Sequence, residues 1–311
     1  MSEQTLIKVV DLSRYYGPTL AVDHISFEIK RGNITGLLGP NGAGKSTTMK
    51  MITGNLAPSS GSIEINGVDL LDHPKQAKEK LGYLPEYPPV YKDQTVDEYL
   101  GFCAAINNIP KSHRRKSIEM AKARCGLEKV GRKLIGLLSK GYQQRLGIAQ
   151  AIIHEPEVVV LDEPTVGLDP LQIREIRELI KELGENHSVL LSSHILSEIQ
   201  ALCNHIHIIN EGRLVYSQEL KKEHSADESQ TLVCEFKHPP ALEEFKKRTG
   251  ATDVSAFNNI FKVNFTTQSD IRDKIVRSSL DGNWGMLQLF IEQESLEHTF
   301  VKLTMEQHEL S

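Results

Sequence analysis

A glycine-rich loop constrains the fold of this chain more than any other segment. It reads Gly39-Pro-Asn-Gly-Ala-Gly-Lys-Ser46 and fits the pattern G-x4-G-K-[ST]. The apolar run Ile34–Leu38 precedes it, and a helix is expected to begin at Gly44–Lys45, because Ser46–Ile52 contains no helix breaker. Glycines let backbone N–H groups turn inward, and the helix start behind them favours bound anions. The loop therefore predicts a binding site for the phosphates of a nucleotide.

Two acidic residues follow a second apolar run. Val158–Leu161 has the composition of a strand buried on both faces of a parallel sheet, and Asp162 and Glu163 come directly after it. Acid pairs also occur at ordinary helix N-termini, but open α/β sheets bind ligands at the carboxyl ends of such strands. With the glycine loop upstream, we expect Lys45 to reach the β- and γ-phosphates, and Glu163 to orient and deprotonate a water. The Ser46 hydroxyl and Asp162 are expected to hold Mg2+, directly or through water.

The composition excludes several classes of protein. With 39% hydrophobic and 25% charged residues among 311, the chain has globular proportions, and its net charge of −5 counts against a dedicated nucleic-acid binder. No run approaches the roughly 20 apolar residues of a membrane-spanning helix, and Met1–Val10 lacks the pattern of a secretory signal. The four cysteines are far apart in the sequence: Cys103, Cys125, Cys203 and Cys234. Their spacing indicates reduced thiols rather than disulfides or a zinc site.

The order of patterns along the chain predicts an α/β domain over residues 1–220. Strand–helix–strand repeats in its later part indicate a parallel sheet with right-handed crossovers. A cluster of prolines, Pro85, Pro88 and Pro89, marks the start of a helical insertion at about residues 87–155. The segments expected in the domain are strands Thr5–Val10, Ala21–Ile29 and Ser188–Leu191, a hairpin at 63–70 with Asn66–Gly67 as its turn, helices Thr95–Ile106 and Ser112–Cys125 in the insertion, and a helix at 173–183.

Residues 221–311 are expected to form a second, smaller α+β domain. The polar segment Lys221–Gln230 is interpreted as the linker to it. The patterns beyond the linker favour the order β-α-β-β-α-β, which is that of a ferredoxin-like fold, with Trp284 in its core. The expected segments are strands at 231–237, 251–257, 260–266 and 284–291, and helices at 240–249, 269–279 and 295–304.

Several short motifs accompany the glycine loop. Leu138-Ser-Lys-Gly-Tyr-Gln-Gln-Arg145 lies before the acidic pair, Pro164-Thr-Val-Gly-Leu-Asp169 follows it, and Ser192-Ser-His194 comes later. With the aromatic Tyr16 upstream, the chain resembles the ATP-binding cassette family, the nucleotide-binding subunits of ABC transporters, over residues 5 to about 218. The three motifs are similar to that family's signature, usually L-S-G-G-Q, its D-loop and its switch histidine.

The resemblance implies a P-loop NTPase core of the ABC ATPase type, with an antiparallel β subdomain and a helical insertion. It implies that ATP with Mg2+ lies between the glycine loop of one copy and the signature of another, in a homodimer or pseudo-dimer. Glu163, His194 and Lys45 would be catalytic. Tyr16 would stack on adenine. Ser46, Asp162 and Glu86 would contact the nucleotide and also hold the metal. The other residues implied to contact nucleotide are Gly39, Pro40, Asn41, Gly42, Ala43, Gly44, Lys45, Thr47, Ser139, Gly141 and Asp169.

The chain departs from the family's usual residues in two motifs. The glutamine loop reads Gly82-Tyr-Leu-Pro-Glu86, so a carboxylate stands where an amide is usual. Glu86 is still an oxygen ligand and is expected to couple the nucleotide to the membrane partner; the alternative is a solvated loop glutamate. In the signature, Lys140 and Tyr142 stand where Gly and Gln are usual, whereas the neighbouring serine and second glycine are retained.

The resemblance implies the ATPase subunit of a transporter whose permease is a separate integral-membrane chain. This subunit would bind peripherally at the cytoplasmic face of the inner membrane, without a nucleic-acid partner. The glutamine loop, the signature and the short C-terminal domain are similar to type-2 exporters, including gliding-motility-type ATPases, which favours export. One alternative is a soluble ABC ATPase acting on ribosomes or DNA, whose members usually carry two cassettes or long coiled coils. The other is a non-hydrolysing regulator, which the intact Lys45, Asp162, Glu163 and His194 disfavour.

A pair of histidines remains outside these motifs. His205 and His207 alternate on an expected strand and share one of its faces. A two-histidine metal site lacks an evident third ligand, so we expect ordinary strand histidines with satisfied hydrogen bonds.

Overall fold

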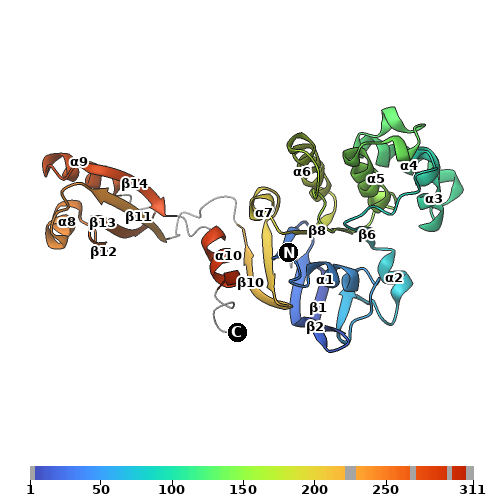
Figure 1. Cartoon of the computed structure of the whole chain (residues 1–311), viewed down its shortest axis with the longest axis horizontal. Helices are drawn as coiled ribbons and strands as arrows, with labels where there is room; N and C mark the ends of the chain where they lie inside the picture. Colours follow the sequence, from blue (N-terminus) through green and yellow to red (C-terminus); the bar gives the residue numbers. More distant parts are fainter. Residues whose placement is uncertain (1–3, 221–228, 267–270, 293–295, 306–311) are drawn as a thin grey trace. The chain divides into compact units, whose positions relative to one another are not determined.

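The computed structural model describes residues 4–220, 229–266, 271–292 and 296–305. The chain divides into two compact units, one made of Met1–Leu220 with Leu303–Ser311 and the other of Lys221–Lys302 (Figure 1). Of the predicted linker Lys221–Gln230, residues 221–228 lie outside the described ranges, and the last two residues begin a strand.

An antiparallel sheet in the order β2-β1-β4-β5 forms one part of the first unit. Its strands are β1 (Thr5–Tyr16), β2 (Thr19–Lys30), β4 (Ser60–Ile65) and β5 (Val68–Asp69). Asn66 and Gly67 form the predicted turn between β4 and β5, with φ angles of 49° and 75°. β1 continues well beyond the predicted Thr5–Val10. The pairing with β2 shifts register between Val9 and Leu12, and this bulge breaks the alternation of apolar residues.

A six-stranded sheet in the order β10-β9-β3-β8-β7-β6 forms the centre of the first unit. β10 is antiparallel to β9, and the other neighbours are parallel, as the alternating strands and helices predicted. Every residue of β7 is buried, as expected for an uninterrupted apolar strand. The strands are β3 (Ile34–Leu38), β6 (Leu81–Leu84), β7 (Val158–Leu161), β8 (Ser188–Ser193), β9 (His205–Asn210) and β10 (Arg213–Glu219).

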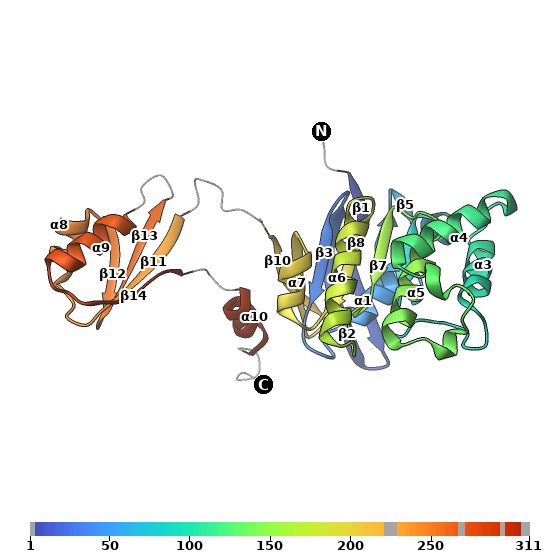
Figure 2. The same ribbon diagram turned by 90° about the horizontal axis from the view of Figure 1, so that it is seen from above.

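Helices cover both faces of the central sheet (Figure 2). α1 (Lys45–Ile52) contributes Met49 to the apolar core that contains Ile63 of β4 and Leu37 of β3, so it lies between the two sheets. On the opposite face of β3, Ile199 of α7 (Leu196–Leu202) packs so close to the backbone of Gly36 that a Cβ atom there would lie 2.7 Å from it. α6 (Pro170–Gly184) packs on β8.

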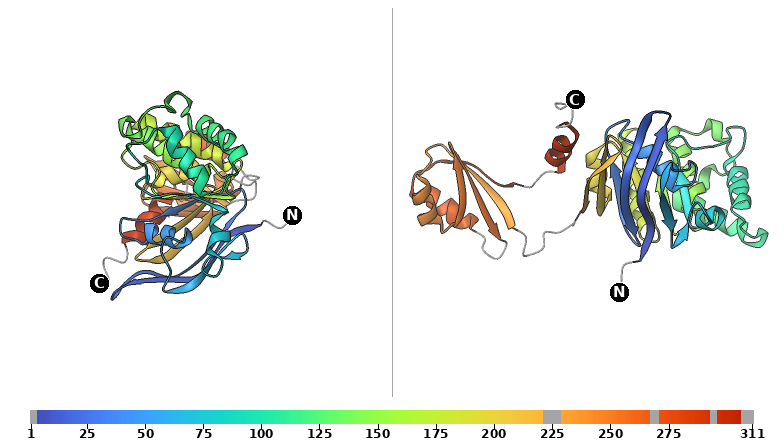
Figure 3. Two further views of the ribbon diagram at one scale, coloured as in Figure 1. Left: turned by 90° about the vertical axis from the view of Figure 1, so that its right-hand side faces the viewer. Right: turned by 90° about the horizontal axis from the view of Figure 1, so that it is seen from below.

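A helical subdomain lies between β6 and β7 in the chain, and Figure 3 shows it in green beside the blue antiparallel strands. Thr95 caps the first helix: its hydroxyl accepts from the Glu98 N–H, while the Glu98 carboxylate accepts from the Thr95 N–H. The predicted helices Thr95–Ile106 and Ser112–Cys125 are confirmed. The elements are α3 (Val96–Ile106), α4 (Lys111–Cys125), 3₁₀ turns at Glu128–Val130 and Ile135–Leu137, and α5 (Lys140–Ile152), with the short α2 (Pro74–Lys78) before β6.

The second unit has the predicted β-α-β-β-α-β order, and its antiparallel sheet runs β12-β13-β11-β14, as in a ferredoxin-like fold. Phe236, Phe245, Phe261 and Trp284 form its aromatic core, in which Trp284 is 3% exposed, as predicted. The predicted helix at 269–279 starts at Arg272, and 267–270 lie outside the described residues. The elements are β11 (Ser229–Phe236), α8 (Leu242–Thr249), β12 (Asp253–Phe257), β13 (Ile260–Thr266), α9 (Arg272–Asp281) and β14 (Met286–Glu292). The last helix, α10 (Leu296–Met305), begins in this unit, but its residues from Leu303 on belong to the first unit.

Two expectations from the composition can be compared with the described ranges. None of the helices within them is long and apolar enough to cross a membrane. All four cysteines are described, and each is a buried free thiol, as predicted.

Candidate functional site

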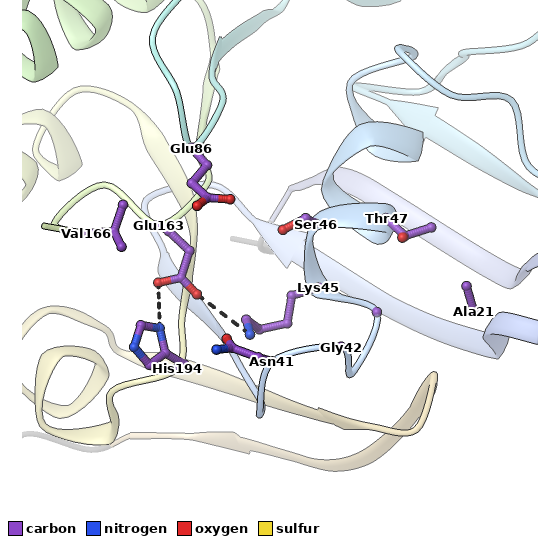
Figure 4. A pocket seen from close by; sticks show the side chains of 11 residues that line it. Ala21, Asn41, Gly42, Lys45, Ser46, Thr47, Glu86, Glu163, Val166 and His194 are labelled. Carbon is purple, nitrogen blue, oxygen red and sulfur yellow. Dashed lines mark hydrogen bonds and ion pairs between the residues drawn. The ribbon is translucent and has the colours of Figure 1, made fainter.

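The parallel strands carry predicted site residues to one edge of the central sheet. The glycine loop follows β3, Glu86 follows β6, Glu163 follows β7 and His194 follows β8. Because these strands run parallel, their carboxyl ends meet at the same edge. Figure 4 shows their side chains around a cavity of about 400 Å³. The cavity is lined by Ala21, Asn41, Gly42, Gly44, Lys45, Ser46, Thr47, Glu86, Glu163, Val166 and His194.

Lys45, the first residue of α1, is buried under the glycine loop. Its Nζ atom donates hydrogen bonds to the carbonyl oxygens of Gly39 at 2.8 Å and Pro40 at 3.1 Å. Burial lowers the pKa of Lys45, and the nearby carboxylate of Glu163 opposes this shift. The loop thus places an ammonium group at the start of a helix, where phosphate oxygens bind.

Gly44 makes the turn from the loop into α1 and leaves no room for a side chain. Its φ of 104° lies in the left-handed region, and a Cβ atom there would lie 2.6 Å from the carbonyl oxygen of Ala21 in β2. The backbone of the loop therefore packs directly against the antiparallel sheet.

Glu163 lies at the centre of the cavity (Figure 4). Its Oε2 atom is 2.9 Å from Nδ1 of His194, and its Oε1 atom is 3.6 Å from Nζ of Lys45. The backbone of Glu163 has a φ of 47°, and its N–H donates to Oγ of Ser192 at 2.8 Å. The buried carboxylate thus lies between the ammonium group of Lys45 and the imidazole ring of His194, and it faces the glycine loop.

Oxygen atoms suited to a hard cation lie beside this carboxylate. Ser46 Oγ is 3.2 Å from Asp162 Oδ1, and Ser192 Oγ donates to the same Asp162 oxygen at 2.6 Å. Burial raises the pKa of Asp162, and the hydrogen bonds from Ser192 and Ser46 oppose the shift. A hydroxyl and a buried carboxylate at the mouth of a phosphate loop match the ligands that Mg2+ prefers. The residues present therefore fit a magnesium–nucleotide site.

The residues of the predicted signature lie elsewhere in the same unit. Ser139, Gly141 and Asp169 line a second cavity of about 370 Å³, together with Tyr142 and Arg145. Ser139 is the N-cap of α5, and Asp169 is the N-cap of α6, where its carboxylate accepts from the Gln172 N–H. None of these residues lines the cavity of the glycine loop, so a single chain does not bring the two sets together.

Tyr16 lies at the end of β1 and is 47% exposed. The guanidinium of Arg14 lies over its ring, 5.1 Å from the centroid. Tyr16 lines neither of the two cavities, so its stacking on adenine stays a prediction.

His207 differs from the expectation of a satisfied histidine. It is 2% exposed, and neither ring nitrogen has a hydrogen-bond partner among the described residues. Its ring packs against Phe27 and His205, and burial lowers its pKa to about 3. Within the described ranges, no group of three or more His, Cys, Asp or Glu side chains could hold a metal ion. His207 is therefore a neutral core residue.

Some residues at the cavity were not predicted from the sequence. Ala21 and Val166 line it with apolar side chains, which carry no chemical signal of a site. Ser192 binds both acidic residues after β7, and its place in the motif Ser192-Ser-His194, two residues before the histidine, is the signal that could have identified it.

Comparison with known proteins agrees with this geometry. The sequence model of the family described as "ABC transporter" matches residues 22–166, and one described as "AAA domain, putative AbiEii toxin, Type IV TA system" matches residues 134–199. The chain is 36% identical over 311 residues to the bacitracin transport ATP-binding protein BcrA of Bacillus licheniformis, covering 96% of this chain and 97% of that protein. The chain belongs to the ABC transporter family of ATP-binding proteins. It is also 30% identical over 307 residues to the linearmycin resistance ATP-binding protein LnrL of Bacillus subtilis, covering 96% and 98% of the two chains.

Solved structures of ABC proteins share the fold of the first unit. The structure of cbiO1 from Clostridium perfringens, part of the ABC transporter complex cbiONQ, matches with a TM-score of 0.65 and 31% identity, over 71% of this chain and 90% of that one. A dimeric ATP-binding cassette bound to ADP and Pi matches with a TM-score of 0.63 at 22% identity, which is a likeness of fold. The predicted ABC ATPase fold is confirmed, and this family member binds and hydrolyses ATP.

Proposed function

We propose that two copies of this chain bind two ATP molecules at a shared interface and that hydrolysis drives export through a separate membrane permease. The observation that carries the proposal is the position of Glu163, between Lys45 and His194 in the cavity of the glycine loop. Phosphoryl transfer to water depends on positioning and on stabilising charge, and this arrangement supplies groups for both.

Each of the three residues has a separate task. Glu163 orients the attacking water and accepts its proton, because its carboxylate is the base that faces the phosphate loop. His194, 2.9 Å from that carboxylate, contacts the γ-phosphate. Lys45 offsets the negative charge on the β- and γ-phosphates. Mg2+, held by Ser46, Asp162 and Glu86, would neutralise further phosphate charge when bound.

A second copy of the chain completes each site. Ser139 and Gly141 lie at the start of α5, whose N-terminus favours an anion, but they line a different cavity from Lys45. A head-to-tail pair of chains brings the signature of one copy over the glycine loop of the other. Asp169 contributes at the same interface, and Tyr16 stacks on the adenine.

The transported compound is inferred from the relatives matched over their whole length. Their names concern bacitracin transport and linearmycin resistance. By extension, the transporter that this chain powers exports a compound of the kind that bacitracin and linearmycin represent. The subunit binds peripherally at the cytoplasmic face of the membrane, and Glu86 lies near its contact with the permease.

The first experiment measures ATP hydrolysis by the full chain, purified with its membrane partner. Glu163→Gln should bind ATP normally and lower kcat by about 100-fold or more, because the base is lost and the shape is kept. Glu182→Gln, an exposed carboxylate on α6, is the matched control and should hydrolyse ATP at the wild-type rate. An unchanged kcat in Glu163→Gln would contradict the proposed role.

The second experiment identifies the partner. An affinity-tagged chain solubilised from membranes should copurify with one integral-membrane protein, and deleting that protein should abolish efflux of the compound. Recovery only with ribosomes or DNA would instead favour a soluble ABC ATPase and would contradict the transport proposal.

A further inference from the structure

A buried carboxylate outside the cavity joins three separate segments of the chain. Glu198 lies on α7 and is 3% exposed. Its Oε2 atom accepts hydrogen bonds from Thr165 Oγ1 at 2.7 Å and from Ser193 Oγ at 3.0 Å. Its Oε1 atom lies 3.4 Å from Nη2 of Arg177 on α6. One side chain thus contacts the loop after β7, the end of β8 and the neighbouring helix.

Both hydroxyl partners stand close in sequence to the central groups of the site. Thr165 lies two residues after Glu163, and Ser193 directly precedes His194. Because both hydroxyls donate to the same oxygen atom of Glu198, the two segments cannot separate without breaking one of the hydrogen bonds. The contact between Glu163 and His194 depends on the same separation.

Glu163 needs such support because its backbone conformation is unfavourable. A φ of 47° places a residue with a side chain in the left-handed region. Such conformations persist where surrounding contacts hold them in place, and they cluster at active sites. The bond from the Glu163 N–H to Ser192 fixes one point, and the Thr165 hydroxyl on Glu198 fixes the chain two residues further on.

The packing of α7 does not require a charge at this position. Leu196, Ile199 and Leu202 already bury the apolar face of this helix. A buried carboxylate is unfavourable unless donors satisfy it, and here two hydroxyls and one guanidinium do so. This carboxylate therefore holds two hydroxyls and one guanidinium, from separate segments, in a fixed arrangement.

We propose that Glu198 is a positioning residue for ATP hydrolysis, which sets the separation of Glu163 and His194 through Thr165 and Ser193. This inference rests on the proposed roles of Glu163 and His194. Its effect falls on the chemical step rather than on nucleotide binding, because none of its hydrogen bonds reaches the glycine loop.

The main test uses two substitutions of Thr165 in the full chain purified with its membrane partner. Thr165→Val keeps the shape and removes the hydroxyl, so kcat should fall by about 10- to 100-fold while KM for ATP changes by less than about twofold. Thr165→Ser retains the donor and should keep kcat within about threefold of wild type. Equilibrium binding of ATP and the thermal unfolding midpoint are measured for each variant.

A second set of variants tests Glu198 itself. Glu198→Gln keeps an oxygen that both hydroxyls can reach, but this neutral oxygen accepts their hydrogen bonds more weakly than a carboxylate does, so its kcat should be intermediate. The double variant Thr165→Val/Glu198→Gln should be about as slow as Thr165→Val alone, because both changes act on one contact. Glu182→Gln serves as the exposed carboxylate control.

Three results would overturn the inference: a wild-type kcat in Thr165→Val, an equal loss in Thr165→Ser, or losses that multiply in the double variant. Glu163→Gln, measured in parallel, separates this failure from failure of the proposed function. If Glu163→Gln loses hydrolysis and Thr165→Val does not, only the role of Glu198 is overturned. If Glu163→Gln retains hydrolysis, the proposed function and this inference both fail.

Discussion

Ser192 Oγ donates a 2.6 Å hydrogen bond to Oδ1 of Asp162. Ser192 belongs to β8 and Asp162 follows β7, so the bond joins two parallel neighbours at the edge where the site lies. It stabilises the ionised carboxylate in part, but burial dominates and raises the pKa of Asp162. The carboxylate is thus kept in a place where its charge is unfavourable until a cation arrives.

We expect Asp162→Asn to stabilise the nucleotide-free protein at neutral pH. The pKa of the Asp162 carboxyl is higher in the folded protein than in the unfolded chain, so the folded protein binds the carboxyl proton more tightly. The free energy of unfolding therefore falls as pH rises from the unfolded-state pKa to the folded-state pKa. Asparagine cannot ionise, so the variant lacks this decrease. Thermal unfolding midpoints, measured from about pH 4 to pH 7, should diverge as pH rises. A difference that does not depend on pH would contradict the prediction.

His207 should produce the opposite dependence on pH. Burial lowers its pKa from 6.5 to about 3, so the unfolded chain binds the proton more tightly, and stability is lost as pH falls below the unfolded value. At pH 5 this loss amounts to about 2 kcal/mol. His207→Leu should remove it, as measured by the free energy of unfolding in urea at pH 7.5 and pH 5. Replacing the exposed His113 with Gln should leave the pH dependence of wild type intact.

The close approach of Gly44 to β2 predicts a strong effect of one methyl group. Gly44→Ala combines a left-handed residue, which costs about 1–2 kcal/mol, with a Cβ atom 2.6 Å from the Ala21 carbonyl oxygen. Relief of that contact costs about 1–3 kcal/mol more. Gly42→Ala is the matched control, because its φ is 84° but no atom lies within 4 Å of the added Cβ. Equal losses of unfolding free energy in the two variants would contradict the packing argument.

The buried ammonium group predicts a specific loss of nucleotide affinity. Lys45→Met keeps most of the side-chain volume and removes the charge-assisted hydrogen bonds to phosphate, so ATP should bind about tenfold more weakly or worse. Lys50→Met removes an exposed lysine from the same helix and should bind ATP as wild type does. Isothermal titration with ATP measures both constants, and equal affinities in the two variants would exclude this role for Lys45.

The sequence predicted those parts of the fold whose burial leaves a regular pattern. β7 is buried along its whole length, so its apolar run alone identified it. β1 was predicted only to Val10, since the bulge before Leu12 interrupts the alternation of side chains. α2 escaped prediction because Ala77 is its one buried residue, and a helix this short and polar has no amphipathic pattern.

The candidate site could be predicted where its residues belong to contiguous motifs. The glycine loop, Glu163 and His194 stand in such motifs, and they line one cavity. The Glu198 network could not be predicted, because the glutamate sits in an ordinary helix and its partners come from three other segments. Its burial is a property of tertiary packing, which one sequence does not reveal.

The separation of the two cavities in the first unit affects how much ATP subunits consume when no permease is bound to them. If each complete site needs halves from two molecules, the number of sites formed by free subunits rises with the square of the subunit concentration. Subunits that no permease holds together would then form few complete sites as long as they stay dilute. They would leave the cellular supply of ATP almost untouched, without any dedicated inhibitor.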